Sequence, residues 1–80
     1  MRLDKYLKIS RLIKRRTVAN EACDAGRVLV NGTVAKASRE VKPGDILEIR
    51  FGNGTTKVEI LSVSDNVSKA DAPAMYREQK

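Results

Sequence analysis

Apolar residues near the start of the chain recur at helical spacing. Leu3, Tyr6 and Leu7 lie at positions i, i+3 and i+4, so they share one side of a helix. Basic residues occupy the other side: Arg2, Lys5 and Lys8. The pattern predicts an amphipathic helix over residues 2–10 with one apolar and one basic face. Tyr6 could stack on a nucleic-acid base, but its spacing favours a place in the core.

The helical phase breaks after this segment. A continuous helix would place Leu12 among the basic residues, so we expect a turn from Ser10 to Arg16. The turn would carry four positive charges at an exposed corner: Arg11, Lys14, Arg15 and Arg16.

A second helix is predicted after the turn. Thr17 is a suitable N-cap, and Gly26 suits the left-handed position just beyond a helix end. Its apolar face would consist of Val18, Ala19, Ala22, Cys23 and Ala25. The lone cysteine is expected to be a small buried side chain.

Beyond Gly26 the pattern is typical of β-strands. Asn31-Gly32 separates two runs rich in β-branched residues, which predicts a tight hairpin. Pro43 and Gly44 suit the central positions of a type II turn. Asn53-Gly54 predicts a second hairpin.

The segment "ILEIRF" between these turns alternates, with Leu47, Ile49 and Phe51 on one face. The predicted fold is therefore α+β, with two N-terminal helices packed on a small antiparallel sheet. Periodicity is lost from Ser64, so we expect a domain over residues 1–63 and a loop and short tail over 64–80. Pro73 would begin a short C-terminal helix through "AMYREQK". An isolated helix of this length is marginal, so the tail is expected to be docked or frayed.

The positive charge is confined to one end of the chain. Residues 1–16 contain seven basic residues and one acid, whereas residues 17–80 contain nine of each, so the first segment carries the whole net charge of +6. Crowded like charges destabilise a fold, which indicates a polyanionic partner.

Arginine binds phosphate through two parallel hydrogen bonds, and a helix N-terminus also favours anions. The predicted binding residues are Arg2, Lys5, Lys8, Arg11, Lys14, Arg15, Arg16, Thr17 and Lys36. For Lys36, Ser38 and Arg39, after the first hairpin, a simply solvated position remains an alternative.

Three kinds of anionic partner are candidates: DNA, RNA and a membrane surface. The small core needs the apolar face of the first helix, which argues against a membrane. Glu21 and Asp24 on the second helix would be repelled from a DNA groove. A compact basic corner suits structured RNA, which proteins recognise by shape and phosphates.

Composition argues against catalysis. The chain has no histidine and one cysteine, so neither the usual acid–base group nor a common zinc site is expected. We expect no cofactor, no metal and no enzymatic activity. A lone cysteine and the lack of a signal peptide or membrane span predict a cytoplasmic protein, and we expect a monomer.

Four segments occur in the order and spacing of a known family: "RLDKYL", "RRTVA", "GRVLVNG" and "VKPGD". They resemble the RNA-binding domain named after ribosomal protein S-four, also called the alpha-L motif, over residues 1–51. The later hairpin and tail fit the small stand-alone members, among which the chain is most similar to bacterial ribosome-associated quality control factors.

The resemblance implies binding to obstructed 50S ribosomal subunits, with contacts to 23S rRNA and peptidyl-tRNA. It also implies cooperation with an RqcH-type tailing factor that adds alanine to stalled nascent chains. The alternatives are recycling of stalled 50S subunits in the manner of the heat-shock members, and a targeting subunit for an RNA-modifying enzyme.

Overall fold

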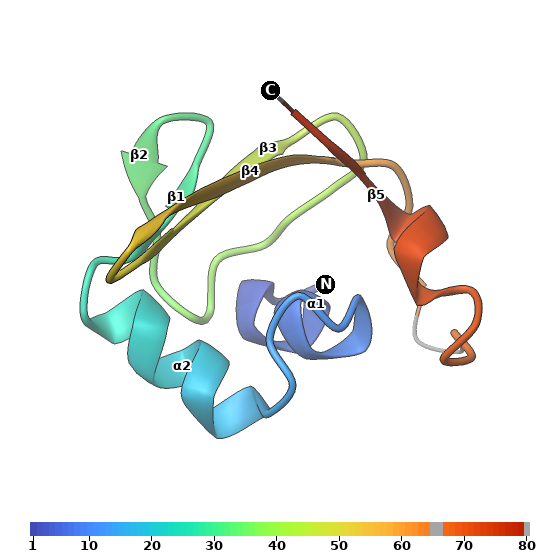
Figure 1. The fold of residues 1–80 in the computed structure, drawn as a ribbon, viewed down its shortest axis with the longest axis horizontal. Helices are drawn as coiled ribbons and strands as arrows, with labels where there is room; N and C mark the ends of the chain where they lie inside the picture. The colour runs from blue at the N-terminus through green and yellow to red at the C-terminus, as the bar shows by residue number, and fades with distance from the viewer. Residues whose placement is uncertain (65–66, 80) are drawn as a thin grey trace.

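The computed structural model describes residues 1–64 and 67–79, and this part of the chain forms two helices beneath one sheet (Figure 1). Helices α1 (Leu3–Ile9) and α2 (Arg16–Asp24) cover one face of the sheet. Five antiparallel strands in the order β2-β1-β3-β4-β5 make up the sheet: β1 (Val28–Val30), β2 (Thr33–Val34), β3 (Ile46–Phe51), β4 (Gly54–Ile60) and β5 (Tyr76–Glu78). The predicted α+β class is confirmed.

Helix α1 is anchored by the apolar stripe that the sequence predicted. Leu3, Tyr6 and Leu7 are completely buried against the sheet. The helix ends at Ser10, and Arg11 follows with a φ of 63°, a left-handed conformation that glycine usually occupies at this position. The break in helical phase is therefore confirmed, and the basic turn leads into α2.

Helix α2 contacts the core through a narrower stripe than the sequence predicted. Ala19 and Cys23 are buried, whereas Val18 and Ala25 are exposed, because only positions one turn apart face the core. The prediction of Thr17 as N-cap is wrong: α2 begins at Arg16, and its N-cap residue, Arg15, makes no side-chain capping bond.

The C-terminal end of α2 follows the prediction. Gly26 adopts a φ of 75°, and its N–H donates to the Cys23 carbonyl. The Arg27 N–H donates to the Ala22 carbonyl, which completes a Schellman motif and turns the chain into β1.

The first hairpin and the type II turn are also confirmed. Asn31 and Gly32 both have positive φ between the paired residues Val30 and Thr33, as a type I′ turn requires. Gly44 has a φ of 97°, and the Asp45 N–H donates to the Lys42 carbonyl.

The second hairpin lies one residue earlier than predicted. Phe51 pairs with Gly54, so Gly52 and Asn53 form the turn and Gly54 already belongs to β4. Leu47 and Ile49 are buried as expected, but Phe51, the last residue of β3, is exposed.

The tail contributes a strand that the sequence pattern did not predict. A 3₁₀ turn spans Ala72–Met75, and β5 then pairs with β4, where the prediction had a helix from Pro73. The Tyr6 hydroxyl donates to the buried Met75 carbonyl at 2.7 Å, so this segment is docked on the core. Residues 65 and 66 of the predicted loop and residue 80 of the predicted helix lie outside the described residues.

Candidate polyanion-binding surface

One buried carboxylate, that of Asp4, organises the basic end of the molecule. Asp4 is only 2% exposed and lies where α1 meets the start of α2. Its oxygens accept hydrogen bonds from four residues: from the Lys5 backbone N–H at 2.8 Å, from Arg2 and Arg16, whose Nε atoms lie at 3.3 Å, and from Asn20 Nδ2 at 3.5 Å. One acid thus joins two arginines that are far apart in sequence.

The backbone holds this carboxylate in place. The N–H of Asp4 donates to the Ala37 carbonyl, and the N–H of Leu3 donates to the Arg39 carbonyl. Burial by itself raises the pKa of the Asp4 carboxyl. The hydrogen bond and charge of Arg16 and the Lys5 N–H outweigh that effect and hold the pKa below its ordinary value. Asp4 is therefore ionised at neutral pH.

The guanidinium groups of Arg2 and Arg16 are oriented without being buried. Each side chain is 49% exposed, and each uses Nε and Nη2 toward Asp4. The distances of 3.3 to 3.5 Å are longer than a close charge-assisted bond of about 2.8 Å. A guanidinium has five N–H donors, so each arginine keeps donors that Asp4 does not engage.

No acid lies near Arg16 in the sequence, so the local pattern indicates no ion-pair partner for it. The fold provides one, since Asp4 contacts Arg16 across twelve positions of sequence. In the sequence Asp4 is the single acid of the basic segment, and nothing in its local pattern indicates this role. Its position in the first turn of α1, on the face toward α2, becomes visible only in the fold.

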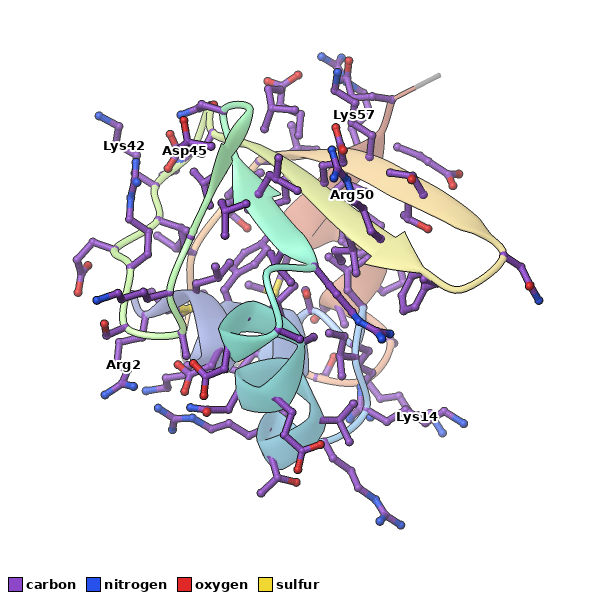
Figure 2. The ribbon with its side chains drawn as sticks, turned by 90° about the vertical axis from the view of Figure 1, so that its left-hand side faces the viewer. Arg2, Lys14, Lys42, Asp45, Arg50 and Lys57 are labelled. Carbon is purple, nitrogen blue, oxygen red and sulfur yellow. The ribbon has the colours of Figure 1, made fainter. Side chains whose placement is uncertain are left out.

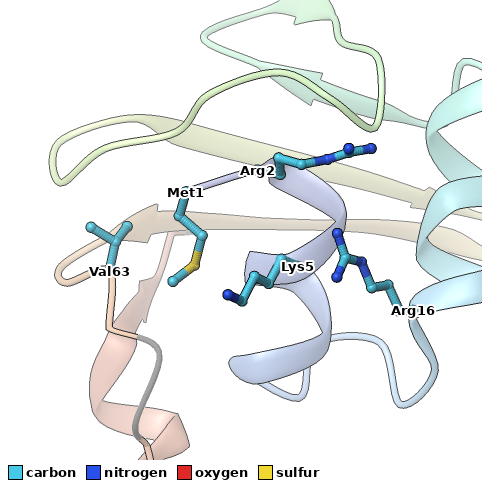
Figure 3. A pocket seen from close by; sticks show the side chains of 5 residues that line it. All are labelled: Met1, Arg2, Lys5, Arg16 and Val63. Atoms are coloured by element: carbon cyan, nitrogen blue, oxygen red, sulfur yellow. The ribbon is translucent and has the colours of Figure 1, made fainter.

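A pocket of about 460 Å³ lies beside these arginines and is lined by Met1, Arg2, Lys5, Arg16 and Val63 (Figure 3). The Arg2 and Arg16 side chains lie at one end, and Met1 and Val63 lie at the other. A second hollow, of about 340 Å³, adjoins it on the α2 side and is lined by Asp4, Arg16, Thr17, Asn20 and Glu21. Thr17 and Asn20 thus lie next to the arginines, and Glu21 gives this hollow an acidic rim.

The other predicted basic residues do not join this cluster. Lys8, Arg11, Lys14 and Arg15 are exposed along the end of α1 and the turn that follows it. Figure 2 shows Lys14 and Arg2 on opposite sides of α2. Lys36 is also exposed, on the loop whose next residue, Ala37, accepts the Asp4 N–H. The fold therefore separates the basic segment into a pocket built on Arg2, Lys5 and Arg16 and a more extended exposed tract.

Other chemistry within residues 1–64 and 67–79 is sparse. Cys23 is buried as expected, and burial together with the charges of Asp4 and Asp24 raises the pKa of its thiol to about 11. No acidic, histidine or cysteine side chains in these residues cluster in a way that could hold a metal ion. None of their helices has the length and apolar character needed to cross a membrane.

Comparison with known proteins matches residues 1–47 to the S4 domain. An RQC P-site tRNA stabilizing factor of Streptococcus pneumoniae is 57% identical over 76 residues, which cover 95% of this chain and 86% of the relative. The factor of the same name from Bacillus subtilis is 54% identical over 76 residues, covering 95% and 88%. The trimeric structure of Vibrio cholerae heat shock protein 15 is 34% identical, with a TM-score of 0.90 over 99% of this chain and 81% of that one.

Proposed function

The chain belongs to the S4 domain family, and from this premise we propose that it is an RNA-binding factor of ribosome-associated quality control, which holds tRNA on obstructed large subunits. The observation that carries the proposal is the convergence of Arg2, Lys5 and Arg16 on one pocket around the buried Asp4. The names and the 54–57% identities of the relatives support the biological setting.

The geometry suits phosphate. Two guanidinium groups whose orientation is set by Asp4 can donate to phosphate oxygens with little further ordering. Arg16 is also the first residue of α2, whose first turn has no side-chain cap. The positive end of this helix and its N–H groups would add to the attraction of an anion placed there. The protein's role in such a complex would be to bind and position RNA.

The exposed tract extends the proposed contact. Lys8, Arg11, Lys14 and Arg15 would meet further RNA phosphates, and Thr17 and Lys36 would border the surface. A surface with two separated basic regions can contact two RNA segments at once. We propose that these are 23S rRNA and the peptidyl-tRNA of an obstructed 50S subunit. The chain would bind as a monomer in the cytoplasm while an RqcH-type factor delivers alanine.

A second candidate function is recycling of stalled 50S subunits without tailing. The TM-score of 0.90 with a heat shock protein 15 favours it. Identity to that protein is 34%, compared with 57% for the pneumococcal stabilizing factor, so the tailing function is the better supported. Co-purification separates the two, because only the tailing function requires an RqcH-type protein on the same particles. If an RNA-modifying enzyme co-purified with the chain instead, the chain would be a targeting subunit for that enzyme.

The test is gradient fractionation of tagged variants with 50S particles. Arg16→Ala removes a charge-assisted contact worth about 1.5–3 kcal/mol, so binding should weaken roughly tenfold to hundredfold. Arg16→Lys should recover only part of it, because lysine keeps the charge but not the two-pronged geometry. The matched control is Arg77→Ala on β5, where the arginine pairs with Glu59 at 2.7 Å, remote in sequence from the basic segment.

Circular dichroism must show that all three variants are folded, because Arg16 also contacts Asp4. Co-migration of Arg16→Ala with 50S particles as strong as that of Arg77→Ala would contradict the proposal.

The salt dependence of binding provides an independent check. If about six phosphates are contacted, affinity should fall roughly a thousandfold between 50 and 200 mM salt, and a flat dependence would contradict an electrostatic interface.

A further inference from the structure

The pocket beside Asp4 has an apolar end that phosphate binding does not require. Met1 and Val63 line that end, and both also pack against the hydrophobic core. In Figure 3 the Lys5 side chain lies between this apolar end and the two arginines. A phosphate would occupy only the cationic end, so the apolar end can accommodate a different chemical group.

We propose that this pocket holds one unpaired nucleotide, with its base against Met1 and Val63 and its phosphate at Lys5 and Arg16. The inference rests on the proposed RNA binding and specifies what the surface recognises. A nucleotide has the same two-part chemistry as the pocket, with a flat apolar face and an anion at one end. The volume of about 460 Å³ lies in the range typical of small-molecule sites.

The apolar end is suited to a base. Methionine sulfur makes favourable contacts with aromatic rings, and the aliphatic side chain of Val63 can pack against the face of any base. Because Met1 and Val63 are partly buried on the core, they form a wall that needs little ordering when a base arrives. Recognition would therefore depend on the presence of a base and only weakly on which base it is.

The cationic end sets the position of the nucleotide. Arg2 and Arg16 are held on Asp4 at 3.3 Å, so a phosphate bound by their remaining donors would lie at the end of the pocket opposite the apolar wall (Figure 3). A duplex would offer phosphates to these arginines, but its stacked bases could not reach Val63. Proteins recognise structured RNA mainly at loops and bulges where a base is unstacked. The pocket thus selects RNA with an extruded nucleotide over a continuous duplex.

The test uses three hairpin RNAs of the same stem, titrated by fluorescence anisotropy. The first carries a single-nucleotide bulge, the second an abasic residue at the bulge, and the third is fully paired. The contacts of a base with Met1 and Val63 predict that the bulged hairpin binds roughly two- to tenfold more tightly than the abasic one. The abasic RNA keeps every phosphate, so this difference isolates the base.

Val63→Ser should reduce the preference for the base, so that the affinities for the bulged and the abasic hairpins become more similar. Val34→Ser on the edge strand β2 is the matched control, because Val34 is 55% exposed and does not line the pocket. Equal binding of all three hairpins by the wild type, with strong salt dependence, would overturn the nucleotide pocket and leave the RNA-binding proposal standing. Failure to bind any of the three would count against both.

Discussion

Asp4→Asn separates the effect of geometry from the effect of charge. The substitution preserves the size and shape of the side chain but removes the negative charge that Arg2 and Arg16 share. It also raises the net charge of the chain from +6 to +7. If RNA binding depended only on the amount of positive charge, affinity should rise. If it depends on how the two arginines are held, affinity should fall.

The magnitudes favour a loss. Ordering a long side chain costs about 0.5–1.5 kcal/mol, so two arginines released from Asp4 would together lose about 1–3 kcal/mol of binding free energy. Against this, the repulsion between charges 4 Å apart is about 1 kcal/mol in water and about 4 kcal/mol near a protein surface. The arginines keep a phosphate farther from Asp4 than that, and salt screens the remaining repulsion. Affinity at 200 mM salt should therefore fall severalfold, and by less at low salt.

Asp4→Asn should also lower the free energy of unfolding. Removing the charge weakens the hydrogen bonds from both arginines, Asn20 and the Lys5 N–H. Because the arginines are half exposed, solvent screening limits the loss, and we expect about 1–3 kcal/mol in the free energy of unfolding.

The stability difference should also depend on pH in one direction. The pKa of Asp4 is lower in the folded state than its ordinary value, so ionised Asp4 stabilises the fold above that ordinary value. The stabilisation is lost as pH falls through the folded pKa. The difference between wild type and Asp4→Asn should be constant above about pH 5 and shrink at more acidic pH.

Urea unfolding from pH 2 to 7 and RNA titrations at 50 and 200 mM salt measure both effects. Asp24→Asn, at the exposed last residue of α2, is the control that adds the same charge without touching the arginines. It should bind RNA as tightly as wild type or slightly more tightly. Should Asp4→Asn bind as tightly as Asp24→Asn at 200 mM salt, the positioning role of Asp4 is refuted.

Three further substitutions test the fold. Leu7→Ala should lower the free energy of unfolding, measured with urea, by about 2–5 kcal/mol, because Leu7 is completely buried. A variant as stable as wild type would show that the buried and exposed faces of the helix are misassigned. Tyr6→Phe removes the hydrogen bond to the Met75 carbonyl and should lower the free energy of unfolding by about 1 kcal/mol, with faster amide exchange in β5. Unchanged exchange would mean that β5 is held in place without this hydrogen bond. Arg11→Gly removes the side chain from a residue with a φ of 63°, a conformation that is strained for residues other than glycine. The free energy of unfolding should rise by up to about 1 kcal/mol, while RNA binding should weaken. A destabilised variant would contradict the view that Arg11 is strained.

Turns and helix faces that depend only on neighbouring residues could be predicted from the sequence. Asn31, Gly32 and Gly44 adopt the positive φ that the two turns require, and Pro43 has the fixed negative φ that suits the position before Gly44. The buried stripe of α1 also followed from its spacing. The start of α2 was predicted incorrectly. The prediction assumed that Thr17 caps the helix, whereas α2 begins at Arg16 without a capping side chain.

Strand β5 depends on a partner rather than on its own pattern. Tyr76–Glu78 has no alternating apolar run, and it becomes a strand because β4 offers it a free edge and Tyr6 holds Met75. Such pairing joins segments that are remote in the chain. A helix was therefore the natural prediction from Pro73 and the residues that follow it.

The sequence by itself determined that this protein has a basic end, an α+β fold and the motifs of the S4 domain, because charge, periodicity and turn chemistry are properties of neighbouring residues. Only the tertiary structure decided which of the basic residues act together. Arg2 and Arg16 meet on Asp4, Val63 approaches Met1 beside them, and Lys14 lies on the other side of α2. The physical reason is that a buried carboxylate attracts whatever donors the packing of α1 against α2 brings within reach.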